Sequence, residues 1–378
     1  MKKFVILWIG ILFSAQFAGA KTINIEVTNP LDESRFETVS VDLAKIGKFK
    51  YAKPAVYCEN FKRFIACQVI DNDSNGTNDE LVFQAEFKAR QVLLFDIVEA
   101  NVVNEVEVLN GAIANYIQQR KDDFAWENDK IAFRMYGQEL QRTELTSSGI
   151  DVWVKKVGRP VMLDLYKKGH GFYHADNPMG IDFFNVGPTL GCGGLGVWHN
   201  GKLLLSENYN EWKIIANGPI RVIFELTYKP WDIGDGRKVG EVKRISLDKG
   251  WNFNRIESKF NRDVNDTTFA VGIVKCERDG KEIYGPENQY LGYWQKEDKK
   301  FGIIGCGVVL TKDSITYKSA EDEKNYMLLA KAKKNSVVYY AGAGWNKNPG
   351  FETEDKWILL IRKIKRQINN PLKVEIKK

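Results

Sequence analysis

Several familiar catalytic motifs are missing from this 378-residue chain. It has no GxSxG nucleophile motif, no phosphate-binding loop, no HExxH zinc motif and no dinucleotide fingerprint after a strand. No spacing of its five cysteines and three histidines matches a structural zinc site. These absences argue against a serine hydrolase, a nucleotide-dependent enzyme and a zinc protease. We expect no cofactor and assign no metal ligand, although the sequence leaves a divalent metal open.

Charge of one sign and long apolar runs are also scarce. The formal net charge is +6 and falls to +4 without Lys2 and Lys3, and no basic run suggests nucleic acid as a partner. The one long apolar stretch lies in residues 1–20, between those lysines and a small-residue site ending at Ala20. This order predicts a signal peptide. Since no other stretch reaches the ~18 apolar residues of a membrane span, we expect a soluble, exported, periplasmic protein without a transmembrane segment.

The five cysteines matter because an exported protein meets an oxidising compartment, where disulfides persist. Cys58 and Cys67 flank a short apolar segment that a hairpin could fold back. We therefore predict that this pair is bridged or lies close together. The odd number of cysteines leaves at least one free thiol.

Apolar and polar residues alternate along much of the chain, a pattern typical of strands with one buried face. It predicts an all-β protein with a small β-sandwich at residues 21–110 and a large β-sandwich at residues 111–378. Residues 112–119 carry a weak helical pattern instead. One clear amphipathic helix precedes the C-terminus, with Thr353 as its cap and Asn370-Pro371 as its end.

The polar segment DNDSNGTNDE at residues 71–80 resembles the start of a calcium loop. Such a loop needs a bidentate carboxylate at its twelfth position, and Val82 stands there. We therefore interpret the segment as a polar hairpin turn.

All three histidines lie in one glycine-rich stretch, residues 170–199. Histidine exchanges protons near neutral pH, and glycine allows a ligand to approach the backbone closely. His170 and His174 have the spacing of neighbours on one helix face, but Gly169, Gly171 and Pro178 argue against a helix there. Loops on a rigid scaffold are common places for functional sites, so we expect the site in this stretch.

Two neighbouring strand patterns carry polar and aromatic side chains on the face opposite their apolar one. Arg134 and Tyr136 belong to the first, and Asp151, Trp153 and Lys155 to the second. We expect this face to meet water or a ligand. Aromatic rings stack on sugars and charged groups bind hydroxyls and carboxylates, so the pattern favours a carbohydrate groove that also contains the histidines.

This set of residues suits proton abstraction from C5 of a uronic acid. The hydrogen on C5 is α to the carboxylate, so its removal builds negative charge that a cation must stabilise. A base with a pKa near 7 takes the proton, and an acid helps the group on C4 to leave. Loss of another sugar from C4 makes the enzyme a lyase, and loss of a hydroxyl makes it a dehydratase.

Five motifs together resemble one bacterial family: ENDKIAFRMYG, GIDVWVKK, GHGFYHAD, DFFNVGPTLGCGG and YYAGAGW. They are similar to the domain-of-unknown-function family 4861 of exported polysaccharide-degradation proteins, and the similarity extends over nearly the whole mature chain. The resemblance implies a galactose-mutarotase-like β-supersandwich and kinship with a dehydratase that acts on ulvan oligosaccharides. Relatives tend to have an acidic, glycine-containing run where this chain has Asn177-Pro178-Met179-Gly180, which puts the substrate in question.

We therefore predict a dehydratase or lyase acting on an anionic, uronic-acid-containing oligosaccharide. His174 is the expected base, Tyr136 or Tyr173 the acid, and Arg134 the group that neutralises the carboxylate. The expected substrate-binding residues are Lys155, Asp151, Trp153, His170, Asp176, Trp198, His199 and Trp345. A polysaccharide lyase, a sugar epimerase and a non-catalytic glycan-binding protein remain alternatives.

Overall fold

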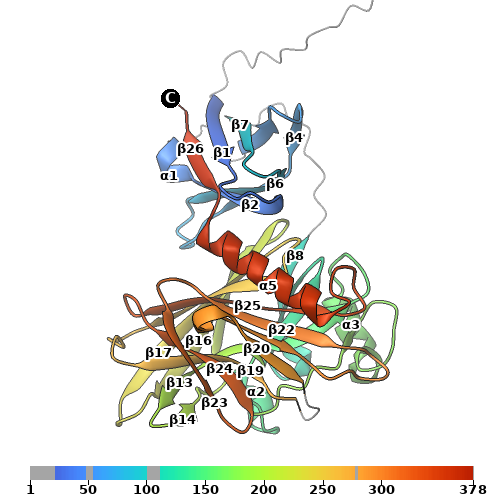
Figure 1. Ribbon diagram of the computed structural model, residues 1–378, viewed down its shortest axis with the longest axis vertical. Coiled ribbons are helices and arrows are strands. Elements are labelled where there is room, and N and C mark those ends of the chain that lie inside the picture. The colour runs from blue at the N-terminus through green and yellow to red at the C-terminus, as the bar shows by residue number, and fades with distance from the viewer. Residues whose placement is uncertain (1–21, 48–53, 100–110, 277–279, 378) are drawn as a thin grey trace, which may run out of the picture.

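The computed structural model describes residues 22–47, 54–99, 111–276 and 280–377. The predicted signal peptide lies outside these residues. None of the helices that they form is long and apolar enough to cross a membrane. The architecture is all-β: two β-sandwiches, one small and one large, joined by a C-terminal helix (Figure 1). The predicted fold class is confirmed.

The small N-terminal section packs two antiparallel sheets around its own apolar core. The first sheet has the order β26 (Lys373–Ile376), β1 (Thr22–Thr28), β7 (Val92–Glu99), β3 (Pro54–Cys58) and β4 (Arg63–Ile65). The second contains β2 (Arg35–Asp42), β6 (Glu80–Phe87) and β5 (Cys67–Ile70), with the one-turn helix α1 (Leu43–Ile46) after β2. The last strand of the chain thus completes the first sheet, so the small sandwich combines both ends of the sequence.

In the large sandwich, an eight-stranded sheet packs against two five-stranded sheets. The order of the large sheet is β15 (Glu211–Asn217), β16 (Arg221–Asp232), β17 (Lys238–Asp248), β18 (Phe253–Phe260), β25 (Ser336–Trp345), β22 (Ile304–Leu310), β21 (Tyr290–Trp294) and β20 (Lys281–Tyr284). One five-stranded sheet has the order β12 (Gly180–Asp182), β11 (Asp151–Lys155), β10 (Ile131–Met135), β9 (Asp123–Asn128) and β8 (Ala112–Ile117). The other has β14 (Lys202–Leu204), β13 (Cys192–His199), β19 (Thr268–Val274), β24 (Asn325–Lys331) and β23 (Ile315–Glu321). A bridge between Ile150 and Gly191 links the two smaller sheets, and one large apolar core fills the space between the layers.

Helix α5 (Glu354–Asn369) lies across the outer face of the large sheet and leads to β26 in the small sandwich (Figure 1). The Thr353 side chain accepts a hydrogen bond from the Lys356 backbone, as the capping pattern predicts. The helix buries Trp357, Ile361 and Ile364 against β21 and β22. The predicted helix and its apolar stripe are confirmed.

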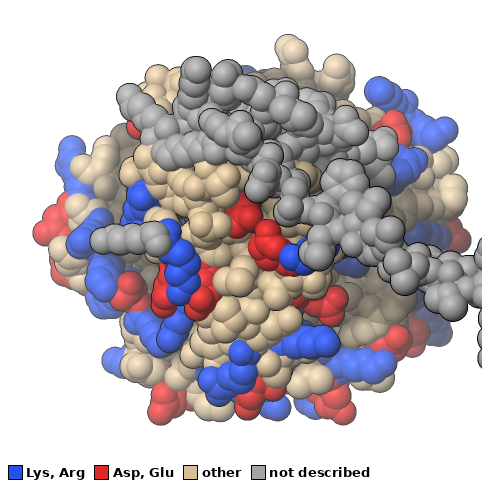
Figure 2. Space-filling model, turned by 90° about the horizontal axis from the view of Figure 1, so that it is seen from above, with Lys and Arg blue, Asp and Glu red and all other residues tan. Residues whose placement is uncertain are grey.

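The remaining helical elements are short. They are α2 (Gln138–Gln141), α3 (Met162–Lys168), α4 (His170–Tyr173) and the 3₁₀ turns η1 (Gln118–Arg120) and η2 (Pro286–Asn288). Seen from above, along the long axis of the molecule, basic and acidic side chains are interspersed (Figure 2). Among the described residues visible in this view, neither sign of charge forms a broad patch.

Two local predictions are wrong. Residues 112–117 form strand β8, because their side chains alternate between the core and the opposite face of the sheet. Cys58 and Cys67 are both free thiols. The predicted disulfide is therefore absent: Cys58 pairs across the hairpin with Arg63, whereas Cys67 lies on β5 in the other sheet. The predicted proximity is not contradicted, because the Cys67 thiol contacts the Pro54 carbonyl of β3 and both cysteines pack in the core of the small sandwich.

Candidate functional site

The site is built on the outer face of the sheet β12-β11-β10-β9-β8. In β10, Ile131, Phe133 and Met135 point into the large core, so Ala132 and Arg134 point outward. The register pairs Arg134 with Asp151, which places the polar side chains of both strands on one face, as predicted. Contrary to expectation, this face is covered by α3 and α4, whose apolar residues pack on Ala132 and Trp153. The outward polar groups are therefore buried.

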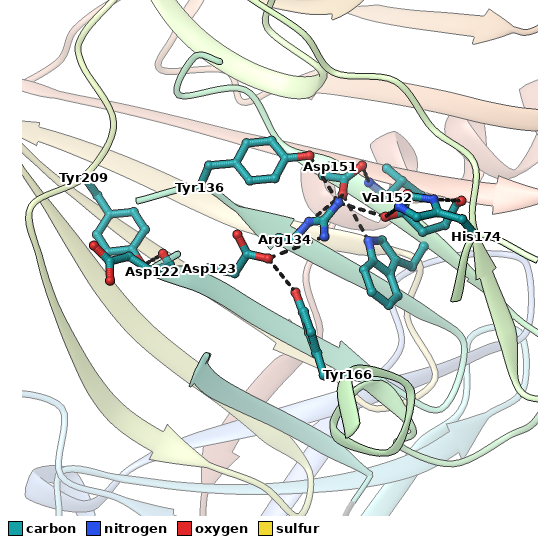
Figure 3. A network of polar contacts seen from close by, with 11 residues as sticks. Asp122, Asp123, Arg134, Tyr136, Asp151, Val152, Tyr166, His174 and Tyr209 are labelled. Carbon is teal, nitrogen blue, oxygen red and sulfur yellow. Dashed lines mark hydrogen bonds and ion pairs between the residues drawn. The ribbon is translucent and has the colours of Figure 1, made fainter. Parts of the chain in front are cut away.

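Arg134 is the centre of a buried network of charges (Figure 3). Its guanidinium donates to Asp151 and Asp182, each at 2.8 Å, and lies 3.4 Å from Asp123. Its Nη2, the atom that donates to Asp182, also donates to the Tyr136 hydroxyl at 3.2 Å. The three carboxylates are at most 1% exposed and Arg134 is 3% exposed. Every direct partner of Arg134 thus comes from the protein, and its expected role as a cation for the substrate carboxylate does not fit this position.

The network contains more negative charge than Arg134 can balance. Burial raises the pKa of Asp123 to about 6 and raises that of Asp182 well above its usual value, with Asp151 adding to the increase for Asp182. Arg134 opposes both increases. Because burial and neighbouring carboxylates disfavour ionisation, the protonated form is favoured most at Asp182, whereas Arg134 and Arg120 both favour the ionised form of Asp123.

His174 lies at the exposed margin of this network, with 38% of its side chain accessible. Its Nδ1 is 2.8 Å from the backbone carbonyl oxygen of Asp182, and its Nε2 is 3.6 Å from the Asp182 carboxylate. Since a carbonyl can only accept, Nδ1 carries the proton and Nε2 keeps its lone pair when the ring is neutral. Burial lowers the pKa of His174, and the positive charges of His170 and Arg134 lower it further, against the hydrogen bond to Asp182. A neutral ring at pH 7 can act as a base.

His170 stands beside His174 because residues 170–173 form α4, which the glycines did not predict. Gly169 has a φ of +91°, and this left-handed residue ends α3 and allows the chain to restart as α4. The rings of His170 and His174 are consequently 4.3 Å apart between centroids. Two exposed imidazoles thus form a pair over the buried network.

The aromatic residues of the predicted site lie beneath this pair rather than open to solvent. Trp153 and Tyr173 are each 1% exposed and stack with centroids 4.5 Å apart. The Trp153 indole also donates to Asp151 at 3.0 Å. Burial raises the pKa of Tyr136 well above its usual value. These rings support the site, but a substrate cannot stack on them without displacing α3 and α4.

Lys155 has a structural role in this conformation. Its ammonium is 2.6 Å from Glu127 and also donates to the Asn128 carbonyl, and the side chain is almost fully buried. The other Glu127 oxygen accepts from the backbone of Val161 and Met162 at the start of α3. Lys155 thus stabilises the carboxylate that caps α3, and it does not reach the histidine pair as a free cation.

Three lysines that the sequence analysis did not select act on Asp176, which follows the histidine pair in the chain. Asp176, two residues after His174, is exposed and forms an ion pair with Lys156. The hydrogen bond and charge of Lys156 lower the pKa of Asp176, and the charges of Lys347 and Lys300 add to this effect. Lys347 also donates to the Lys300 carbonyl at 3.0 Å. This group, Lys156, Lys300 and Lys347, is hereafter the lysine rim; its members come from distant parts of the sequence, so spacing could not reveal it.

Aromatic residues lie next to the lysine rim in the chain: Phe301 follows Lys300, and Trp345 is two residues before Lys347. Trp345 is 2% exposed and its indole donates to the Phe301 carbonyl, so its predicted stacking face is covered. Phe301 packs against Phe183 with centroids 5.4 Å apart. Phe183 follows Asp182 directly and lines a cavity of about 480 Å³, which also contains Lys275 and Lys296. The cavity is therefore connected to His174 through Asp182, which holds the His174 ring, and its neighbour Phe183.

Trp198 and His199 do not join the site. The start of β13 lies near the site sheet, because the Cys192 backbone donates to the Ile150 carbonyl next to Asp151. Trp198 and His199 lie at the other end of β13, roughly 20–23 Å along the strand from Cys192. In Figure 1, β13 and β14 lie across the sandwich from α3. His199 contacts Asn200 at 2.9 Å and lies 3.3 Å from Asp235. The histidine stretch thus divides into a pair at the site and one residue elsewhere.

The loop at residues 71–79 forms the connection between β5 and β6, as the turn interpretation predicts. The carboxylates of Asp71, Asp73 and Asp79 nevertheless converge within 4.8 Å. Among the described residues this is the one such group of potential metal ligands, and it belongs to the small sandwich rather than to the histidine pair.

Comparison with known sequences identifies the family. A model of the domain of unknown function DUF4861 matches residues 27–374. The chain belongs to this family. This DUF4861 protein is also 32% identical over 370 residues to Uncharacterized protein P7 of Formosa agariphila, and the match covers 93% of each chain.

Solved structures share the fold of this DUF4861 protein. A protein in glycosyl hydrolase family 38 from Enterococcus faecalis matches with a TM-score of 0.52 and 10% identity over 94% of this chain. An α-mannosidase from Enterococcus faecalis V583 matches with the same TM-score and coverage at 9% identity. The chain spans less than half the length of either protein, 47% and 46%. At this identity the likeness concerns the fold alone.

Proposed function

We propose that this protein is an exported carbohydrate-active dehydratase that converts a terminal uronic acid of an oligosaccharide into a 4,5-unsaturated sugar. The observation that carries the proposal is the geometry of His174. Its Nδ1–H is fixed on the Asp182 carbonyl, its Nε2 lone pair is available, and its pKa is lowered. A base held in this way is suited to removing the proton from C5.

The lysine rim supplies the positive charge that this reaction needs. As the C5–H bond breaks, the electron pair moves onto the substrate carboxylate, and preorganised cations stabilise that charge. Lys156, Lys300 and Lys347 all act on Asp176, two residues after His174 in the chain. They take the role first expected of Arg134 and Lys155, which are buried in internal ion pairs.

His170 is the proposed acid. It is exposed and adjacent to His174, whereas the hydroxyls of Tyr136 and Tyr173 belong to buried side chains. Its imidazolium gives a proton to the C4 hydroxyl as the C4–O bond breaks. The C5 proton remains on His174, water leaves, and the C4–C5 double bond forms with no change in oxidation state overall. The cavity of about 480 Å³ beside Phe183 leaves room for the rest of the oligosaccharide.

The test is incubation with defined uronic-acid oligosaccharides, followed by ultraviolet absorbance and mass spectrometry. A dehydratase produces an absorbing product that has lost one water and kept its chain length. Two shorter products, one of them absorbing, indicate a lyase, and deuterium uptake at C5 from D₂O without absorbance indicates an epimerase. Saturable binding without any of these changes contradicts the proposal and favours a glycan-binding protein.

A further inference from the structure

A second cavity lies where the small sandwich meets the outer face of the large sheet. Its volume is about 320 Å³, near the lower end of the range for small-molecule sites. The small sandwich contributes Glu37, Thr38, Asn72 and Glu80, and the large sheet contributes residues of β16, β17, β18 and β25. The cavity is therefore separate from the histidine pair, which lies on the other layer of the large sandwich.

Strand alternation explains the polar floor of this cavity. On β17, Ile245 and Leu247 point into the large core, so Arg244 and Ser246 point outward beneath the small sandwich. Neighbouring strands add Arg255 and Tyr340 in register, since Arg255 pairs with Ser246 on one side and with Tyr340 on the other. Three adjacent strands thus place charged, hydroxyl and aromatic side chains side by side.

Several of these groups have unused hydrogen-bonding capacity. The Tyr340 hydroxyl, the Ser246 hydroxyl and the Trp251 indole make no hydrogen bond with any of the described residues. They are not isolated from solvent, because each side chain is only partly buried. Three such groups around one cavity can therefore exchange hydrogen bonds with water for hydrogen bonds with a polar ligand.

The charges of the cavity are already balanced. Arg221 binds Asp248 through two bonds of 2.6 and 2.8 Å and also reaches Glu80 at 3.0 Å. Arg244 lies 3.0 Å from Glu225, outside the lining itself. Arg255 is looser, with Glu257 at 3.3 Å and 40% of its side chain exposed. Because no unpaired charge remains, the lining favours an uncharged ligand with several hydroxyl groups.

We infer that this cavity binds a neutral sugar ring of an oligosaccharide, independently of the histidine pair. The Trp251 and Tyr340 rings supply apolar surface for the C–H face of a pyranose. Arg255 donates to adjacent ring hydroxyls, and the Tyr340 and Ser246 hydroxyls bind others. A sugar held here also contacts Thr38 of the small sandwich, so its binding links the two sandwiches.

The experiment titrates the full-length mature protein with three neutral trisaccharides, of β-glucose, β-galactose and α-mannose, by calorimetry and thermal melting. At least one should bind saturably and raise the melting temperature, because a ligand that binds only the folded state stabilises it. Trp251→Ala and Tyr340→Phe should each weaken that binding roughly 2–12-fold, the loss that an ordinary stacking or hydrogen-bond contribution produces. Trp212→Ala, which changes an exposed tryptophan elsewhere on the same sheet, is the matched control and should bind like the wild type.

The variants also separate this site from the catalytic one. His174→Ala should bind the neutral sugar with unchanged affinity, whereas Tyr340→Phe should retain wild-type turnover of a short uronic-acid substrate. Tyr340→Phe is the decisive variant if Trp251→Ala fails to fold, since it removes one oxygen atom. Unchanged affinity in folded Tyr340→Phe and Trp251→Phe proteins, or no saturable binding of any of the three sugars, overturns the inference.

Discussion

Asp182 contacts His174 through its backbone carbonyl and Arg134 through its side-chain carboxylate. The imidazole Nδ1 meets the Asp182 backbone carbonyl at 2.8 Å, while the Asp182 carboxylate lies 2.8 Å from Arg134. The backbone contact fixes the tautomer of His174, and the side-chain contact ties the same residue to the buried charge network. The accessible base is thereby held by a rigid part of the sheet, as a preorganised site requires.

Replacing His174 should separate catalysis from binding. We expect His174→Ala to lower kcat by roughly 10²–10⁴-fold, the usual contribution of a general base, with little change in calorimetric affinity. His199→Ala is the matched control, because that imidazole lies at the far end of β13. Wild-type turnover by folded His174→Ala protein would remove this residue from the mechanism.

The activity should fall at acidic pH. The pKa of His174 is lowered below 6.5, mainly by burial, and only its neutral form accepts a proton. A profile of kcat/KM against pH should therefore rise with pH on its acidic side, with the midpoint of that limb below 6.5, and should fall again at higher pH, where the proposed acid is deprotonated. The midpoint should move upward in His170→Gln, because the His170 charge that lowers the pKa of His174 is then absent. A midpoint above 6.5 in the wild type contradicts the assignment.

Arg134 should matter for folding more than for substrate binding. Arg134→Met leaves three buried carboxylates without their cation, and breaking a buried ion pair in this way typically costs about 3–5 kcal/mol. The free energy of unfolding, measured in urea, should fall by about that amount. Arg142→Met, which removes an exposed partner of Glu139, should change it by less than ~1 kcal/mol. A stable Arg134→Met protein with weakened substrate affinity would restore its role as a substrate ligand.

The lysine rim should be detectable in the affinity for anionic substrates. Lys300→Ala and Lys347→Ala should each raise KM for a uronic-acid oligosaccharide several-fold and lower kcat, because the carboxylate gains charge in the transition state. The effect should shrink at high salt, since exposed charges are screened. Lys318→Ala on the exposed strand β23 is the control. Equal kinetics for all three variants would exclude the rim.

Asp123 should make stability depend on pH in a predictable direction. Its pKa is about 6 in the folded protein against 3.8 when exposed, so the folded state binds more protons between these values and gains stability as pH falls. Between about pH 7 and 4.5 the wild type should gain about 2 kcal/mol relative to Asp123→Asn. Urea unfolding at both pH values measures this difference. A difference that stays constant with pH would show that Asp123 does not titrate there.

The sequence was sufficient to predict the all-β fold class, most of the strands, the C-terminal helix and the family, because these depend on local periodicity, capping and linear motifs. It also predicted that Arg134 and Asp151 share one face, since alternation within a strand fixes which side chains lie together. It did not predict that α3 and α4 cover that face, because the alternation of polar and apolar residues in a strand is the same whether the polar face is covered by helices or open to solvent. Burial then made Arg134 and Lys155 internal partners rather than substrate ligands.

Only the tertiary structure decided which cations accompany the histidine pair. Lys156, Lys300 and Lys347 lie up to 191 positions apart in the chain, and the packing of loops from different strands brings them to Asp176. His170 and His174 likewise became a pair through a one-turn helix that glycine content argued against, since Gly169 interrupts the helix before His170 and not after it. Sequence determined which faces are polar, and long-range packing determined which of them a substrate can reach.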